Sequence, residues 1–275
     1  MAEIYFDKME GAGNDFIVID NRSNLFSLDE IIEMTPKLCN RKFGVGADGI
    51  LVLENPKIAN VDYTMVYRNA DGSDAGMCGN GSRCLALYAV TKGFSSVHTF
   101  NVHKAIYTAE VDEMQQTVQI SFPDVKNPTP LTIDDRPLSQ VYTGTEHVVK
   151  FVSSDALEIE EELVIEGSSI RWHDTLNPPG SNVNFVHKID SNNIKLQTYE
   201  RGVENLTLAC GTGAIASAIA AHHVNGSIDG TFTTNVNVKG GLLQVLFDYN
   251  NSESIYTKTK LKGPANFVFS GMFNA

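Results

Sequence analysis

Apolar and polar residues alternate along most of the chain, in short runs rich in β-branched and aromatic residues. This pattern is typical of half-buried β-strands, and the turn residues between the runs mark the strand ends. In the first half it predicts strands at 3–6, 16–20, 50–53, 61–67, 97–101, 105–110 and 117–122. In the second half it predicts strands near 147–152, 182–189, 194–200, 231–238, 242–247 and 254–260, and a last run at 266–269 that can return to complete the first sheet.

Three segments break this alternation and predict helices. Ser27 and Glu30 have the spacing of a capping box, and the helix that follows has an apolar face. The residues of that face are Leu28, Ile31, Ile32 and Leu38. We expect Pro36 to kink this helix or to end it, because proline cannot donate the backbone hydrogen bond of a helix interior.

The other two helices are predicted at the apolar runs 85–90 and 215–221, each of which follows a glycine-rich stretch. Helices that are small or apolar on nearly every side are normally buried all round. The sequence therefore predicts an α+β fold with two pseudo-symmetric domains, each a mixed β-sheet curled around a central α-helix. Prolines between residues 123 and 137 suit a boundary, so we expect one domain of 1–122 with 264–275 and a second of 123–263.

Composition narrows the classes of function. The 275 residues carry a formal net charge of −12 and a pI of about 5.0, which makes a nucleic-acid surface unexpected. The first residues lack the apolar region of a signal peptide, and no apolar run approaches the ~20 residues that a membrane helix needs. We therefore expect a cytoplasmic protein that binds neither nucleic acid nor membrane.

Four cysteines in a chain of this length are too few for a disulfide framework, and the absence of a Cys-x-x-Cys pair gives little support to a zinc site. Cys78 and Cys210 lie about half the chain apart, and each precedes the glycine-rich start of a predicted buried helix. A helix N-terminus presents backbone N–H groups and the positive end of the dipole, which favour a thiolate. The pattern indicates an internal repeat with one reactive cysteine per half, whereas Cys39 and Cys84 are expected to be ordinary buried residues.

Two such cysteines suit the inversion of a carbon centre beside a carboxylate without redox chemistry. A thiolate removes a proton from one face, a thiol delivers a proton to the other, and the reverse reaction exchanges their roles. Helix N-termini would stabilise the charge that builds up on the carboxylate. No P-loop, no dinucleotide-binding glycine motif and no cluster of metal ligands occurs in the sequence, so we expect no cofactor and no metal.

Five stretches of the sequence, taken in order, resemble the diaminopimelate epimerase family. These stretches are residues 11–16, 69–73, 77–81, 199–202 and 209–213. The resemblance runs from residue 4 to about residue 271, and the fold of the family is the one that the pattern predicts. It implies a cofactor-independent epimerase, acting as a homodimer, that interconverts LL- and meso-diaminopimelate in lysine and peptidoglycan precursor biosynthesis.

The resemblance also assigns roles to single residues. Cys78 and Cys210 match the two catalytic cysteines, and His147 and Glu200 match positions that tune the cysteine pKa values. Asn14 matches an asparagine that contacts the substrate. The helix-end residues that would hold the reacting carboxylate are Gly79, Asn80, Gly211 and Thr212. The residues that would hold the distal amino-acid end are Asn69, Asn182, Glu200, which would face an ammonium group, and Arg201.

The chain departs from the family pattern at two places. Residues 144–147 read Gly-Thr-Glu-His where the family often has Gly-Asn-Pro-His, so Thr145 stands in place of an asparagine that touches the substrate. Thr145 can still form hydrogen bonds. Gly49 stands where some members carry a glutamine, so any side-chain contact from that position is lost.

Two other functions account for part of the sequence. A proline or hydroxyproline racemase has a similar pair of cysteine motifs, but it gives no reason for Asn14, Glu200 and Arg201 to hold a second amino-acid end. A thiol redox or metal-binding protein would use the same four cysteines. Stoichiometric metal, or a readily formed disulfide in the resting protein, would identify that second class.

Overall fold

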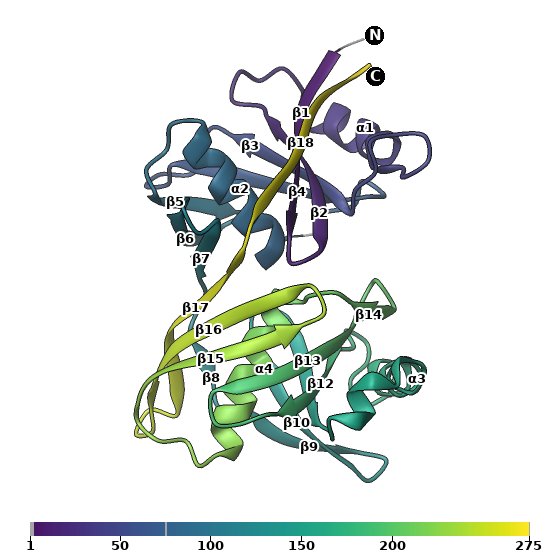
Figure 1. The fold of residues 1–275 in the computed structure, drawn as a ribbon, viewed down its shortest axis with the longest axis vertical. Helices are drawn as coiled ribbons and strands as arrows, with labels where there is room; N and C mark the ends of the chain where they lie inside the picture. Colours follow the sequence, from purple (N-terminus) through teal and green to yellow (C-terminus); the bar gives the residue numbers. More distant parts are fainter. Residues whose placement is uncertain (1–2, 75, 275) are drawn as a thin grey trace. The chain divides into compact units, whose positions relative to one another are not determined.

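The computed structural model describes residues 3–74 and 76–274, which form two compact units (Figure 1). Unit 1 comprises Met1–Ile120 and Gly263–Ala275, and unit 2 comprises Ser121–Lys262. The chain thus passes from one unit to the other close to the proline-rich stretch, and returns for its last strand.

Unit 1 contains one mixed sheet. Its strands, in their order across the sheet, are β18 (Asn266–Asn274), β1 (Glu3–Gly11), β2 (Asn14–Asp20), β3 (Gly49–Glu54), β4 (Tyr63–Asn69), β5 (Val97–Val102), β6 (Ala105–Asp112) and β7 (Thr117–Ser121). The pairs β2–β3 and β4–β5 are parallel, and the others are antiparallel. The predicted return of the last run to the first sheet is confirmed, because β18 pairs with β1 over its whole length.

The sheet of unit 1 is wrapped around α2 (Gly79–Thr91), which contacts β1, β2, β3, β4 and β6 (Figure 1). Residues 79–89 of this helix are all buried, as its composition predicts. Gly81 lets the helix approach the sheet closely, since a Cβ added there would lie 2.9 Å from Leu51 Cδ2. The sequence therefore places the start of α2 against the ends of the strands that carry the glycine-rich loops.

The second helix of unit 1, α1 (Leu28–Cys39), begins at the predicted capping box: Ser27 Oγ accepts from the Glu30 N–H, and the Glu30 carboxylate accepts from the Ser27 N–H. The helix does not end at Pro36, so of the two expected effects of this proline the ending is wrong. Ile31 and Leu38 pack into the core on either side of Pro36 and hold the last turn in place. Leu28 and Ile32 are exposed, since the inward face is narrower than the apolar pattern suggests.

Unit 2 repeats the plan of a mixed sheet around a buried helix. Its strands are β8 (Val125–Lys126), β9 (Thr129–Ile133), β10 (Arg136–Tyr142), β11 (Glu146–Phe151), β12 (Asn182–Lys188), β13 (Asn193–Glu200), β14 (Asn205–Thr207), β15 (Gly230–Val238), β16 (Gly241–Asn250) and β17 (Ile255–Pro264). The pairs β11–β12 and β13–β15 are parallel. The central helix, α4 (Gly211–Val224), contacts β10, β11, β12, β13, β15 and β16. The α+β class with a sheet curled around a central helix in each half is confirmed.

Some elements of unit 2 were not predicted. They are the 3₁₀ turn Asp155–Glu158, the helix α3 (Glu160–Arg171) and the strands β8, β9, β10 and β14. The inward face of α3 contains Gly167 and Arg171 beside Leu163 and Ile170, so its pattern is barely apolar. Gly167 is needed there because an added Cβ would lie 2.7 Å from the Tyr199 ring.

Candidate active site

Cys78 is the residue immediately before α2, with extended backbone angles that turn its side chain toward the start of the helix. The Gly81 N–H donates to Cys78 Sγ at 3.4 Å, and the Cys78 thiol donates to Asn14 Oδ1 at 3.8 Å. An N–H group and the positive end of the helix dipole therefore both act on this sulfur, and both favour a thiolate. The structure thus brings together two of the predicted site residues, Cys78 and Asn14.

A carboxylate fixes the orientation of Asn14. Asn14 Nδ2 donates to Asp48 Oδ2 at 2.5 Å, which turns Oδ1 of the same amide toward Cys78. Arg41 in turn donates to Asp48 and, through both terminal nitrogens, to Asp15. Lys8 completes the cluster with an ion pair of 2.6 Å to Asp15. Asp48 and Arg41 were not among the predicted site residues, although Asp48 lies in a glycine-rich segment, residues 43–49.

Asp15 anchors this cluster and should contribute to stability. Burial alone would raise the pKa of Asp15, but the hydrogen bonds and charges of Arg41 and Lys8 lower it well below its ordinary value. A carboxylate with a lowered pKa stabilises the fold above its ordinary pKa near 4, and this stabilisation is lost as the pH falls below that value. We expect Asp15→Asn to lower the free energy of unfolding by about 1–2 kcal/mol at pH 7, a figure reduced because Arg41 is solvent-exposed.

Urea titrations at pH 7 and pH 3 would measure this effect. Asp20→Asn is a matched control, because Asp20 forms an ion pair with a single cation among the described residues, half-buried Arg22 two positions along the chain, whereas Asp15 pairs with both Arg41 and Lys8. Asp20 should therefore contribute less than Asp15. An equal loss for the two variants at pH 7 would contradict the assignment.

The other predicted residues of unit 1 lie at the ends of α2 and β4. Gly79 and Asn80 are the first two residues of α2, and Asn80 Oδ1 accepts from Arg83 Nη2 at 2.8 Å. Asn69 ends β4 and donates from Nδ2 to Ser73 Oγ at 3.1 Å. It adjoins the cluster around Asn14, since the next residue, Ala70, donates its N–H to the Asp48 carbonyl.

Cys210 occupies the corresponding position in unit 2, immediately before α4 and nearly buried. Its Sγ lies 3.7 Å from Thr212 Oγ1, and Gly211 and Thr212 form the start of the helix. Gly213 allows a close approach, because an added Cβ would lie 2.5 Å from Asn184 Oδ1 and 3.2 Å from Cys210 Sγ. The N-terminus of α4 therefore lies directly against β12 and its polar side chains.

His147 is completely buried next to this helix start, on β11. Asn184 Nδ2 donates to His147 Nδ1 and to the Val148 carbonyl, while Asn184 Oδ1 accepts from Thr198 Oγ1. Because the amide is fixed in this orientation, the proton of the neutral imidazole is on Nε2. Burial first, and then the charge of Arg201, lower the pKa of His147 to about 3, although the bond from Asn184 opposes this. His147 is therefore a neutral hydrogen-bond donor near pH 7. Among described residues, its Nε2 atom has no partner.

The buried neutral His147 predicts a loss of stability in mild acid. Its folded pKa of about 3 lies below the ordinary value of about 6.5, so the unfolded chain binds more protons between those pH values. No stability is lost above pH 6.5, and the loss grows as the pH falls, by about 1.4 kcal/mol per unit. Between pH 6.5 and pH 5, we expect the free energy of unfolding of His147→Asn to fall by about 2 kcal/mol less than that of the unsubstituted protein. Urea titrations at the two pH values measure both losses. Equal losses would show that His147 does not titrate in this way.

Arg201 follows β13 and is held by a set of polar contacts. Its guanidinium donates to Glu146 Oε2 at 3.0 Å and to Thr145 Oγ1 at 2.9 Å, and its backbone N–H donates to Asn182 Oδ1 at 2.8 Å. Thr145 and Glu146, which stand where the family often has Asn-Pro, thus both contact Arg201. Glu200 is the last residue of β13 and is half-buried.

The predicted residues therefore form one cluster in each unit. Unit 1 has Cys78 with Asn14 and the start of α2, and unit 2 has Cys210 with the start of α4, near His147 and the Arg201 group. Across residues 3–74 and 76–274, no three His, Cys, Asp or Glu side chains converge as ligands of a metal ion. In the same ranges, no helix is long and apolar enough to cross a membrane.

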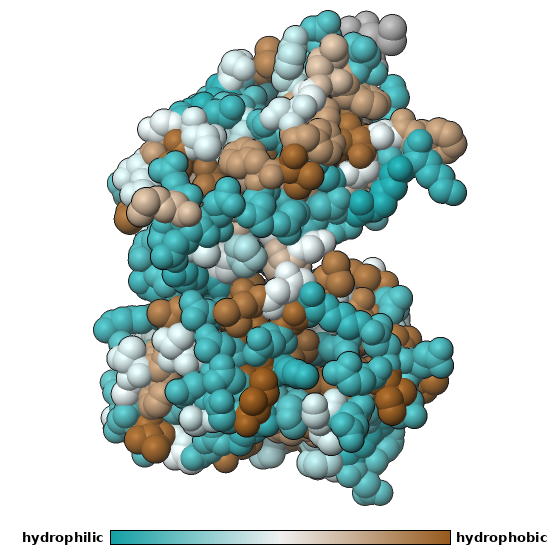
Figure 2. Space-filling view, viewed as in Figure 1, coloured by the Kyte–Doolittle hydropathy of each residue, from teal (hydrophilic) through white to brown (hydrophobic). Residues whose placement is uncertain are grey.

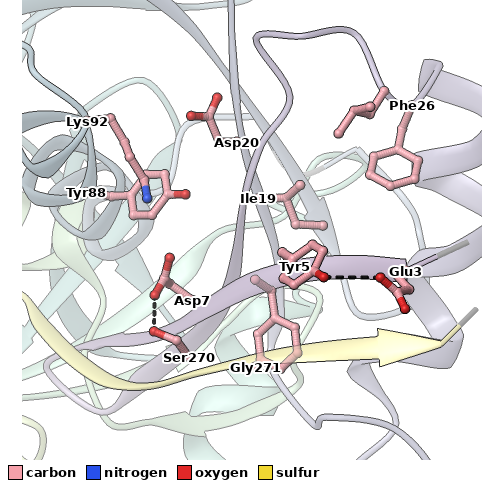
Figure 3. Close-up of a pocket in the computed structure, with 12 residues that line it drawn as sticks. Glu3, Tyr5, Asp7, Ile19, Asp20, Phe26, Tyr88, Lys92, Ser270 and Gly271 are labelled. Carbon is pink, nitrogen blue, oxygen red and sulfur yellow. Dashed lines mark hydrogen bonds between the residues drawn. The ribbon is translucent and has the colours of Figure 1, made fainter.

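A cavity of about 450 Å³ in unit 1 lies apart from both clusters (Figure 3). Strands β1, β2 and β18 and helix α2 contribute to its walls, which include Asp7, Asp20, Tyr88 and Lys92. In Figure 3, Ser270 donates to Asp7 and Tyr5 donates to Glu3 among the lining residues. None of the predicted site residues lines this cavity, so its size is no reason to place the reaction there.

Solved structures with the same fold define the class of protein. A phenazine biosynthesis protein of the PhzF family from Bacillus anthracis matches with a TM-score of 0.77 at 14% identity, covering 100% of both chains. A hydroxyproline epimerase from Agrobacterium vitis, solved with trans-4-hydroxy-L-proline bound, matches with a TM-score of 0.70 at 12% identity, covering 98% of this chain and 92% of the other. These matches establish the fold: this chain has the fold of those two proteins.

Sequence comparison narrows the class to one family. The family model for diaminopimelate epimerase matches residues 6–120 and 139–268. A diaminopimelate epimerase from Flavobacterium psychrophilum is 41% identical over 95% of this chain and 97% of its own. One from Chlorobaculum tepidum is 36% identical over 96% of this chain and 98% of its own. The chain belongs to the diaminopimelate epimerase family, whose members are isomerases.

Proposed function

We propose that the protein interconverts LL- and meso-diaminopimelate in lysine and peptidoglycan precursor biosynthesis, with Cys78 and Cys210 as the two acid–base groups of one reaction. The observation that carries this proposal is that each cysteine immediately precedes a buried helix, in each of two units with the same plan. This is the environment in which a thiol readily becomes a thiolate. The names of the related proteins supply the substrate.

Each half of the proposed site combines a base with groups that stabilise an anion. The first backbone N–H groups of α2 belong to Gly79 and Asn80, and those of α4 belong to Gly211 and Thr212. These groups suit the reacting carboxylate, which must carry the charge of the carbanion. One thiolate takes the α-proton, and the opposite thiol returns a proton to the other face. Neutral His147 supports this scheme as a hydrogen-bond donor near Cys210 rather than as a base.

The distal end of the substrate needs a carboxylate site and an ammonium site. Arg201 offers a guanidinium fork, which suits a carboxylate, and Asn182 bonds to its backbone N–H. Glu200, one residue earlier, would face the ammonium group, and Asn69 belongs to the same proposed set. A proline or hydroxyproline racemase has no second amino-acid end, so these residues favour diaminopimelate over that alternative.

The test of this function is direct. Purified protein should convert LL-diaminopimelate into a mixture of the LL and meso forms. Chiral chromatography measures this conversion. L-proline and trans-4-hydroxy-L-proline in parallel assays test the alternative substrates. Turnover of proline without turnover of diaminopimelate would replace the proposal by the racemase.

We expect the activity to need no cofactor or metal. Exhaustive dialysis against EDTA should leave kcat unchanged, because both proton transfers are assigned to side chains of this chain. The active protein should also show no pyridoxal absorbance band. Loss of activity on dialysis that returns when one metal ion is added would overturn this expectation and favour the metal-binding alternative.

A cytoplasmic homodimer completes the proposal. The antiparallel pair β1–β18 carries a group of exposed apolar side chains, Tyr5, Phe267, Val268, Phe269 and Met272. Brown and tan atoms interrupt the hydrophilic surface of unit 1 in Figure 2. Exposed apolar surface of this kind commonly marks a protein interface, and a second copy of the chain is the partner that the family suggests. Sedimentation of Phe269→Glu against the unsubstituted protein tests this, since a charge at the interface should yield monomers.

A further inference from the structure

Arg83 is a cation buried inside unit 1, one turn into α2 from Cys78. Its side chain has no exposed surface. The guanidinium donates from Nη1 to the Gly79 carbonyl at 3.2 Å, from Nη2 to Asn80 Oδ1 at 2.8 Å and from Nε to the Pro264 carbonyl at 3.1 Å. All three acceptors are neutral, so these bonds satisfy the N–H groups but leave the positive charge unpaired.

An unpaired buried charge is costly, and charged side chains are rarely fully buried without a partner. Within the described residues, no carboxylate lies at ion-pair distance from Arg83. Burial lowers the pKa of Arg83, and electrostatic interactions with Cys84, Cys78 and Glu10 act against this. A guanidinium keeps its proton in a protein, so a fixed positive charge lies behind the start of α2.

Most other ionisable groups near this helix start are paired, hydrogen-bonded or neutral. They are Lys8 and Glu10 on β1, Asp15 on β2, Asp48 before β3, Arg68 on β4 and Cys84 on α2. Asp15 pairs with Lys8, and Arg41 joins Asp15 to Asp48. Glu10 accepts from the Gly13 N–H and from Asn266. Burial raises the pKa of Cys84 far above its ordinary value, so that thiol stays neutral.

We propose that Arg83 is a positioning residue for the reaction: its buried charge stabilises the thiolate of Cys78, and its bond to Asn80 fixes the amide at the start of α2. This inference rests on the proposed function for the identity of the reaction. Charge and helix dipole act in the same direction, because both place positive potential at the N-terminus of α2. The bond from the Cys78 thiol to Asn14 Oδ1 favours the protonated form, and the buried charge opposes it by favouring the thiolate.

The bond from Asn80 to Arg83 has a second consequence. Because Oδ1 of Asn80 accepts from the guanidinium, the amide nitrogen is the end that points away from Arg83. Arg83 thus fixes the orientation of this amide from behind the first turn of α2, without touching the substrate itself.

A purely structural role for Arg83 is the alternative, since its Nε bond to Pro264 links α2 to the junction between β17 and β18. Such a clamp would affect stability but not the protonation of Cys78. The two roles are therefore separated by measuring the thiolate itself.

The experiment follows the rate of alkylation by iodoacetamide against pH in a Cys210→Ala background. Cys39 and Cys84 are buried, and burial raises the pKa of both thiols, so the fast reaction reports on Cys78. We expect half-maximal alkylation of Cys78 below the pH of about 8.5 that is usual for a free thiol. Arg83→Met, which keeps the length and removes the charge, should move that midpoint up by about one pH unit or more.

Arg83→Lys is the matched control, because lysine keeps a positive charge but lacks the planar set of N–H donors of the guanidinium. It should leave the alkylation midpoint near that of the unsubstituted background while lowering kcat/KM for diaminopimelate, since Asn80 loses its fixed partner. A midpoint unchanged in Arg83→Met, or one already at 8.5 or higher with Arg83 present, would overturn the inference. The midpoint with Arg83 present can be measured even if Arg83→Met does not fold.

The outcomes also separate this inference from the proposed function. Alkylation needs no turnover of substrate. A shifted midpoint in a protein that does not act on diaminopimelate would therefore support the effect of Arg83 on Cys78 and contradict the proposed epimerase function. Full epimerase activity with an unshifted midpoint would keep the function and remove the role of Arg83.

Discussion

Cys78→Ala and Cys210→Ala are each expected to lower kcat for diaminopimelate epimerisation by at least roughly 10²–10⁴-fold, the usual scale of general acid–base catalysis. Each cysteine acts as a base in one direction and as an acid in the other, so neither variant should retain either direction. Both sulfurs lie beside the starts of buried helices, and alanine removes the reacting atom while keeping the helix N-terminus.

Cys39→Ala is the control for this experiment. Cys39 is buried in the core of unit 1 beside Leu38 and Ala47, and burial raises the pKa of its thiol. Its loss should lower stability slightly and leave kcat of the folded protein unchanged. A single alanine variant at Cys78 or Cys210 that still epimerises at a comparable rate would remove the two-base mechanism.

Isotope exchange examines the same mechanism without substitution. The base that removes the α-proton keeps that proton while the intermediate lives, whereas the opposite thiol has exchanged with solvent. In heavy water, early product should therefore carry deuterium at the inverted carbon, and recovered substrate should stay protiated. Mass spectrometry at low conversion distinguishes this from a single base, which would wash deuterium into substrate at the rate of product formation.

The fold could largely be predicted because its signals are local. The capping box at Ser27 fixes the start of α1, and the all-apolar runs after the two cysteines identify α2 and α4 as central helices. Alternation located most strands to within a few residues. What escaped prediction lacks such signals: α3 packs a face that includes Gly167 and Arg171, and the strands of the proline-rich stretch are short and exposed.

The residues of the candidate site also differ in whether a local sequence signal marks them. Residues at helix starts could be predicted from sequence, because a glycine-rich turn before an apolar run determines where the N–H groups point. The contacts of Asp48, Asn184 and Arg83 could not, since each of these residues bonds to a partner that is distant in sequence, which for Arg83 is Pro264. Asp48 reaches Asn14 from a neighbouring loop, and Asn184 sets the tautomer of His147 from the adjacent strand.

Arg201→Met should cost about 3 kcal/mol in transition-state stabilisation, or about 10²-fold in kcat/KM for diaminopimelate. Methionine keeps much of the side-chain length but removes the guanidinium, so the distal carboxylate of the substrate would lose its charged partner. In the structure the guanidinium binds Glu146 and Thr145. The side chain of Glu146 is 34% exposed, so the substrate carboxylate can compete for this arginine.

Glu146→Gln separates the two consequences of losing Arg201. It breaks the ion pair of Arg201 but leaves the guanidinium free for substrate, so it should reduce kcat/KM far less than Arg201→Met. L-lysine provides the second comparison, because it has the same distal ammonium and no distal carboxylate. Its inhibition constant as a competitor should hardly change in Arg201→Met, while the KM for diaminopimelate rises. If lysine and diaminopimelate weaken equally, Arg201 does not hold the distal carboxylate, and its role lies in the local bonds to Glu146 and Thr145.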